Sequence, residues 1–325
     1  MDRAVPFACS RPITVRLGTP GPAVMSMKYL PVGTHGIYHE TEDRVPVRRA
    51  CRDRLQHWHL PHALTRFDTA LGSTTVLTAG THTGRPPVVL LPGAGLNAST
   101  TLAAIAALGE NHRVLVPDLP GEPGLSSSRR PHRHWHHLYG QWLDEVLPQL
   151  STDPVIVVGH ALGAAIALAA TPGDRVAGLV LVNPAGIAAI RRTWQLTRIR
   201  AQWMYSPTLD HSEQLLSYLL APRFIPDVGL VCWYAMIAEH CFPGRLPRPL
   251  PARTVGRWAE RVPVIVATGE HDRLVGPDRL RGRVRSLLGV DVQILPGCGH
   301  LVLREAPESV ADLTSSIPPS EKDTV

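Results

Sequence analysis

The residues of greatest chemical interest lie near the centre of the chain, where an apolar run leads into two spaced glycines. Residues 155–158 read Val-Ile-Val-Val, and residues 159–163 read Gly-His-Ala-Leu-Gly before an alanine-rich segment. In a strand, sharp turn and helix with the pattern Gly-x-Ser-x-Gly, the turn exposes a serine hydroxyl that attacks a carbonyl carbon. The central residue here is Ala161, and a methyl group cannot attack. The sequence therefore predicts a catalytic turn without its nucleophile.

The elements that must position this turn follow from the spacing of short apolar runs. Strands that are apolar on both faces are typical of buried parallel sheets, and helices between them indicate crossover connections. Two short strands, at 65–68 and 74–78, precede the series. The expected parallel strands lie at 88–91, 114–116, 155–158, 179–182, 264–267 and 292–295, with helical segments at 99–109, 135–150 and 161–170.

This order of elements, together with the turn at 159–163, resembles the α/β-hydrolase fold over residues 65–312, and within it the small bacterial serine carboxylesterase-like group. The resemblance implies a mostly parallel central sheet with crossover helices. It also places a nucleophile, an acid and a histidine in that chain order at strand ends. The matching positions are Ala161, Asp272 and His300. Asp272 would hold the His300 ring in one tautomer and stabilise its protonated form.

The resemblance also identifies two backbone amides that would stabilise a developing oxyanion. One is the Ala94 N–H, in the loop Leu-Pro-Gly-Ala-Gly at 91–95, and the other is the Leu162 N–H, directly after the turn. The family usually has histidine where this chain has Pro92, which leaves the backbone donor in place. A further matching loop, residues 118–126, is expected to shape a turn through Asp118 and its glycines.

The segment 186–261 interrupts the alternation of strands and helices. It contains no convincing strand but holds most of the tryptophan and tyrosine residues of the chain. We expect a helical lid there, inserted before the acid-bearing strand and lying over the sheet edge. The expected organisation is a loose tail at 1–36, a core at 37–185 and 262–316, the lid at 186–261 and a second tail at 317–325.

Composition excludes several classes of function. The net charge of +6 comes almost entirely from arginines spread along the chain, which does not favour a nucleic-acid partner. No apolar run is long enough for a membrane span. The five cysteines include no Cys-x-x-Cys pair, and the histidines at 132–137 lack nearby acids, so we expect no disulfide framework and no metal.

We therefore expect a cytoplasmic protein without metal or organic cofactor that binds a small apolar or acyl-type substrate; the oligomeric state stays open. Three hypotheses explain Ala161. The chain is a serine hydrolase of carboxylic esters or thioesters whose covalent route is disabled. Alternatively, it is an enzyme that uses His300 and Asp272 without a covalent intermediate, as a cyclase, lyase or cofactor-free oxygenase would. The third hypothesis is a ligand-binding protein that has lost catalysis.

Overall fold

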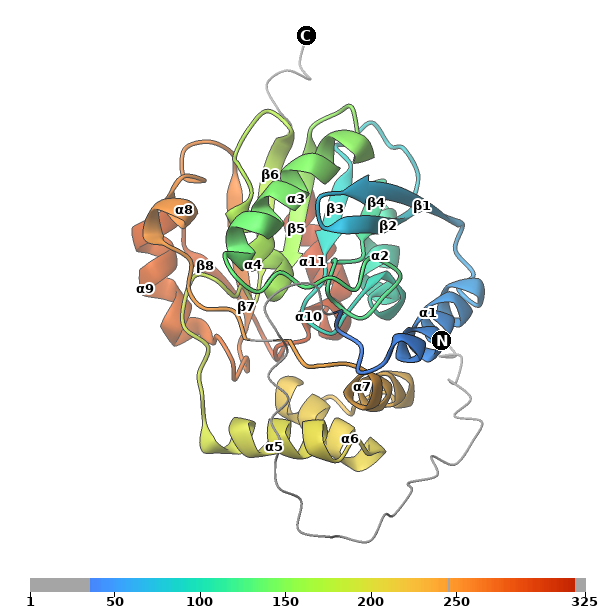
Figure 1. Cartoon of the computed structure of the whole chain (residues 1–325). Helices are drawn as coiled ribbons and strands as arrows, with labels where there is room; N and C mark the ends of the chain where they lie inside the picture. Colours follow the sequence, from blue (N-terminus) through green and yellow to red (C-terminus); the bar gives the residue numbers. More distant parts are fainter. Residues whose placement is uncertain (1–35, 245, 319–325) are drawn as a thin grey trace, which may run out of the picture.

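The structure, a computed structural model, describes residues 36–244 and 246–318. One sheet contains eight strands in the order β1-β2-β4-β3-β5-β6-β7-β8 (Figure 1). Strands β1 and β2 are antiparallel to each other, β2 is antiparallel to β4, and all pairs from β4 to β8 are parallel. The strands are β1 (His62–Thr69), β2 (Gly72–Ala79), β3 (Val88–Leu91), β4 (Val114–Pro117), β5 (Val155–His160), β6 (Val176–Val182), β7 (Val264–Gly269) and β8 (Val292–Leu295).

This sheet confirms the expected α/β-hydrolase fold, with a mostly parallel sheet and crossover helices. The core helices are α1 (Arg44–Gln56), α2 (Leu102–Gly109), α3 (Trp135–Leu150), α4 (Leu162–Ala169), α8 (Ala252–Gly256), α9 (Pro277–Leu288), α10 (Val302–Glu305) and α11 (Pro307–Ser315), with single turns η1 (Thr41–Asp43) and η2 (Ala98–Thr100). None of the helices in the described residues combines the length and the apolarity that crossing a bilayer requires.

The apolar runs are explained by helices that cover both faces of the sheet. In β5, Val155 and Val157 pack in one hydrophobic cluster, with α3 and α4, whereas Ile156 and Val158 pack in another, with α2 and α11. Both faces of such a strand are removed from water, so every position along it must be apolar. The same alternation in the neighbouring strands fixes the sheet between its two helical layers (Figure 1).

Three helices, α5 (Trp194–Tyr205), α6 (Leu209–Leu219) and α7 (Val228–His240), form a separate layer below the sheet in the view of Figure 1. The fourth helix of the segment expected to be a lid, α8, packs instead on α4 and α9 in the core. Trp203 and Trp233 are buried, and the Trp203 indole donates to the Tyr234 carbonyl at 3.0 Å. Trp194, by contrast, is 80% exposed. Some aromatic residues of this segment are therefore buried in the protein, and others face the solvent.

The two expected tails lie almost entirely outside the described residues. At the amino end, Gly36 forms a β-bridge with Arg129, and Ile37 is buried. At the carboxyl end, Ile317 is also buried, and its side chain lies against Gly178 of β6. The packed part of the chain therefore includes Ile317, the first residue of the expected second tail.

Candidate active site

The turn between β5 and α4 has the backbone of a sharp, strained elbow. Ala161 has φ 48° and ψ −108°, a conformation that residues with a side chain rarely adopt. Its N–H donates to the Val182 carbonyl at 3.1 Å, and its own carbonyl accepts from Ala165 and Ala185 at 3.2 Å each. These bonds to β6, α4 and the following loop hold the turn in place, with Ala161 lining a cavity.

The glycines on either side of this turn are required because backbone passes directly over them. A Cβ atom on Gly159 would lie 2.6 Å from the Ala164 Cα, and one on Gly163 would overlap the carbonyl oxygen of Leu91 in β3. Only residues without a side chain therefore allow α4 to pack this closely on β3 and β5. The spacing Gly-x-x-x-Gly thus reflects close packing as well as the turn itself.

Replacing Gly163 by alanine should destabilise the protein strongly, because rigid backbone cannot move away from the added methyl group. We expect the free energy of unfolding to fall by about 3 kcal/mol, measured by urea denaturation. The matched control is Gly282→Ala in α9, where an added Cβ meets nothing within 4 Å and helix propensity should improve slightly. Equal stability of the two variants would contradict the close packing described for the elbow.

His300 and Asp272, from the loops after β8 and β7, form a buried hydrogen-bonded pair. The His300 Nδ1 lies 3.0 Å from the Asp272 Oδ2. Burial by itself would raise the pKa of Asp272, but His300, Asn183 and the Leu274 N–H, which all interact with the carboxylate, outweigh it and hold the pKa at about 2. The ionised carboxylate accepts the Nδ1–H, so the His300 Nε2 carries the free lone pair. His300 also lines the cavity.

Asn183, at the end of β6, is a further component of this pair whose role the sequence left undefined. Its Nδ2 donates to the Asp272 Oδ2 at 2.7 Å and to the Gly299 carbonyl at 3.0 Å. The residue is fully buried and has φ 46°, which asparagine tolerates better than most residues. Asn183 therefore ties the acid loop to the histidine loop, and its position at a parallel strand end was the available signal.

His160, the residue before the turn, is a second imidazole at this site. Its Nε2 lies 2.7 Å from the His300 carbonyl oxygen, so Nε2 carries the proton and donates it. Burial, followed by repulsion from His300, lowers the pKa of His160 to about 4. The His160 Nδ1 is buried and has no hydrogen-bond partner among the described residues. His160 is thus a neutral ring that supports the backbone of His300.

This lowered pKa predicts an acid-dependent loss of stability. An unfolded histidine has a pKa of about 6.5, so between pH 6.5 and 4 the unfolded chain binds the proton that folded His160 refuses. The stabilisation is present above pH 6.5 and is lost as the pH falls to 4, by about 3 kcal/mol. Urea denaturation at several pH values gives the unfolding free energies of the natural chain and of His160→Gln. The stability advantage of the natural chain over this variant should become smaller as the pH falls. A difference independent of pH would contradict it.

The two amides predicted to form an oxyanion hole both border the cavity. Ala94 follows β3, and Leu162 is the first residue of α4, where the helix dipole adds a partial positive charge. Neither N–H donates to any acceptor in the described part of the chain. Two amide hydrogens are therefore available to a carbonyl or carboxylate oxygen of a ligand.

The loop that carries Ala94 is held by side chains that the sequence did not identify. The Gly95 N–H donates to the Glu122 carboxylate at 2.9 Å, and the Gly95 carbonyl accepts from the Trp233 indole at 2.7 Å. Trp233 belongs to α7, so the lid contacts the amide-bearing loop directly. Asp118 was expected only to shape a turn, and it does so by accepting from the Ala98 and Leu125 amides at 2.9 and 2.7 Å.

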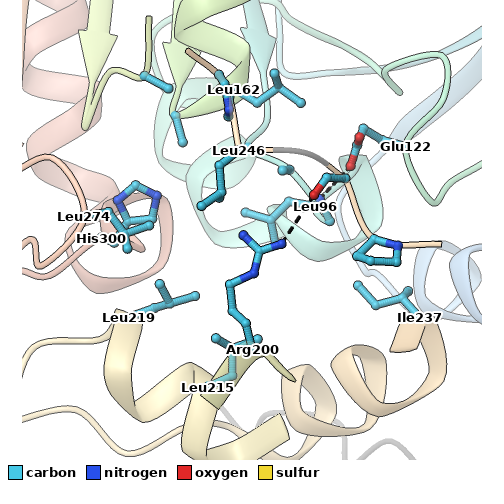
Figure 2. A pocket seen from close by; sticks show the side chains of 18 of the residues that line it. Leu96, Glu122, Leu162, Arg200, Leu215, Leu219, Ile237, Leu246, Leu274 and His300 are labelled. Atoms are coloured by element: carbon cyan, nitrogen blue, oxygen red, sulfur yellow. Dashed lines mark hydrogen bonds between the residues drawn. The ribbon is translucent and has the colours of Figure 1, made fainter. Parts of the chain in front are cut away.

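A cavity of about 150 Å³ lies between the elbow and helices α5, α6 and α7, the part of the expected lid that forms a separate layer. Figure 2 shows its walls: the loops of the core above and α5 and α6 below, with leucine side chains on most sides and the His300 ring at one edge. Its apolar surface greatly exceeds its polar surface. The apolar residues that line it include Leu96, Ile190, Leu196, Trp203, Leu215, Leu219, Ile237, Leu246, Leu274 and Val275.

Four of the five residues singled out from the sequence, Ala94, Ala161, Leu162 and His300, line this single cavity, and Asp272 contacts it through His300. Cys298 does not line it; this residue is buried, and burial raises its thiol pKa. Among the described residues no group of three or more histidine, cysteine, aspartate or glutamate side chains could hold a metal ion. The histidines at 132–137 are not among the residues that line the cavity.

Comparison with known proteins agrees with the α/β-hydrolase fold. Residues 88–313 match the family model described as the alpha/beta hydrolase family. The chain is 36% identical over 250 residues to the magnesium-chelatase 30 kDa subunit of Rhodobacter capsulatus, covering 70% of this chain and 85% of that protein. It is 40% identical over 131 residues to esterase Rv0045c of Mycobacterium tuberculosis, covering 40% and 42% of the two chains.

Solved structures show the same fold at low sequence identity. Carboxylesterase CesB of Bacillus subtilis superimposes with a TM-score of 0.71 at 19% identity, covering 85% of this chain and 98% of that one. The naproxen esterase of Bacillus subtilis gives a TM-score of 0.69 at 19% identity with the same coverage. The family model spans most of the residues that form the sheet, the elbow and the paired Asp272 and His300, and the chain belongs to the alpha/beta hydrolase family.

Proposed function

We propose that the cavity binds the carbonyl group of an apolar acyl compound as a carboxylic-ester or thioester hydrolase does, and that Ala161 closes the covalent route. The observation that carries the proposal is the arrangement around the Ala161 methyl group. His300 with its carboxylate partner and the two unpaired amides of Ala94 and Leu162 border the cavity that this methyl group lines. In a hydrolase of this fold, the attacking oxygen stands at the central residue of the elbow.

The remaining groups keep defined chemical roles. The N–H groups of Ala94 and Leu162 would donate hydrogen bonds to the carbonyl oxygen of the ligand and stabilise negative charge that develops on it. His300, oriented by Asp272, would take a proton at Nε2 from water or from the ligand. The apolar walls exclude bulk water, which strengthens both interactions. What the alanine removes is the oxygen that would form an acyl intermediate.

The proposal is tested by restoring that oxygen. The Ala161→Ser variant should hydrolyse p-nitrophenyl esters and react with a fluorophosphonate probe, since in this proposal the serine oxygen is the one group that the natural chain lacks. A folded serine variant without either activity would contradict the hydrolase assignment. Native chemistry that needs no covalent intermediate, as in a cyclase, lyase or cofactor-free oxygenase, would instead depend on His300 and be indifferent to Ala161→Gly.

A second candidate function is non-catalytic and is favoured by the similarity to the magnesium-chelatase 30 kDa subunit, which extends over 85% of that protein. In this hypothesis the chain binds a ligand in the cavity and assembles with a magnesium chelatase as an auxiliary subunit. Size-exclusion chromatography with purified chelatase subunits tests it directly. Co-elution that survives His300→Ala would support the auxiliary role, and separate elution would argue against it.

A further inference from the structure

One positively charged side chain of the cavity, that of Arg200, has no countercharge within the part of the chain that the structure describes. Arg200 projects from α5 into the middle of the cavity, between Leu215 on the lid and the loops that bear the elbow (Figure 2). Its Nη2 donates to the Gly244 carbonyl at 3.3 Å, a long hydrogen bond. No ion pair joins Arg200 to a carboxylate anywhere in residues 36–244 and 246–318.

The other charged residues of the cavity are already paired. Glu122 and Arg130 form an ion pair at 3.2 Å, and both side chains are largely buried. Glu122 also accepts from the Gly95 N–H, and the Arg130 guanidinium donates to the carbonyls of Gly121 and Phe242. Their charges cancel, so among the described residues that line the cavity the Arg200 guanidinium is the one positive charge without a carboxylate partner.

The Arg200 guanidinium is partly buried among the apolar side chains of the cavity. Burial lowers the pKa of Arg200, and repulsion from Arg192 lowers it further. A charge that is partly removed from water is normally balanced by a partner, because burial removes part of its hydration. A guanidinium has five N–H donors in a planar fork that matches a carboxylate through two parallel hydrogen bonds. We therefore expect the ligand to supply the carboxylate that pairs with Arg200.

We propose that Arg200 binds the carboxylate of an apolar acid, so that the cavity selects an anionic ligand over a neutral one. This proposal rests on the proposed function only in taking the cavity as the ligand site. A single free charge fits a monoanion, whereas a phosphate dianion would bring a second negative charge, and no second unpaired arginine or lysine lies among the described lining residues to balance it. A cavity of about 150 Å³ is of the size that accommodates one aromatic ring.

The test compares two isosteric probes, 3-phenylpropanoate and 3-phenylpropanamide, by isothermal titration calorimetry on the natural chain. We expect the acid to bind at least tenfold more tightly than the amide. Arg200→Met should abolish this preference, and Arg200→Lys should retain part of it, because the lysine keeps the charge but not the fork. Thermal unfolding of both variants confirms that they fold. The matched control is Arg198→Met, on the same helix but exposed and bonded only to Gln202 among the described residues, which should leave the preference unchanged.

Three results would overturn the proposal: equal affinity of acid and amide, no binding of either probe, or tighter binding of 2-phenylethylphosphonate than of the acid. None of these measurements requires turnover. An acid preference that depends on Arg200 would therefore stand even if Ala161→Ser had no esterase activity, and esterase activity without acid preference would refute only the role of Arg200.

Discussion

Ala161→Ser is expected to convert the protein into an esterase, with p-nitrophenyl ester hydrolysis at least about 10³-fold above that of the natural chain. The serine would occupy a turn whose backbone is already formed, at φ 48° and ψ −108°. His300 is held by Asp272 at 3.0 Å with its Nε2 available as the base. Steady-state kinetics on short-chain nitrophenyl esters measures the gain, and covalent labelling by a fluorophosphonate measures the nucleophile directly.

Ala161→Gly is the matched control for this result, because it changes the same residue without adding a nucleophile. It should show neither hydrolysis nor labelling. Mass spectrometry of a labelled peptide that contains residue 161 would place the adduct on the new serine. Labelling elsewhere, or hydrolysis unaffected by the probe, would mean that the activity does not arise at the elbow.

The second large effect concerns the pair that activates the new serine. In the Ala161→Ser background, Asp272→Asn should lower kcat by about 10⁴, as expected for loss of the carboxylate that orients a catalytic histidine. His300→Ala should remove nearly all of the hydrolysis that proceeds through the new serine. Among the described residues, no other imidazole is hydrogen-bonded to Asp272. Both are measured as kcat on a nitrophenyl ester with fluorophosphonate labelling in parallel.

Glu270→Gln provides the control, since this carboxylate lies two residues from Asp272 in the same loop but is half exposed and next to His271. It should leave kcat unchanged. A fall of similar size in Glu270→Gln and Asp272→Asn would show that the loop needs its net charge rather than one particular carboxylate. Retention of full activity in His300→Ala would remove His300 from the mechanism.

The sheet and the elbow were predictable because their physical constraints are local. Val155–Val158 is apolar on both faces, as only a strand covered from two sides must be, and glycines flank a turn that permits no side chain beside it. Asp272 and His300 were found through the order of strand ends, which the fold imposes on the chain. These features can be recognised from consecutive residues or from the order of strands and helices along the chain.

The remaining site residues depend on contacts between distant segments. Asn183 acquires its role only because β6 places it beside Asp272, and the Trp233 indole meets Gly95 across 138 residues of sequence. In the sequence, Arg200 cannot be distinguished from a surface arginine of an amphipathic helix. Its place in the cavity depends on how α5 packs on the core. No periodicity marks such residues, since their partners are set by the tertiary packing of the lid.

The hydrogen bond from Trp233 to Gly95 connects helix α7 directly to the loop that bears the Ala94 amide. An outward displacement of α7 that broke this bond would release the backbone next to Ala94. Access to the cavity past α7 and the alignment of the Ala94 amide would then be coupled, because one hydrogen bond connects the two segments.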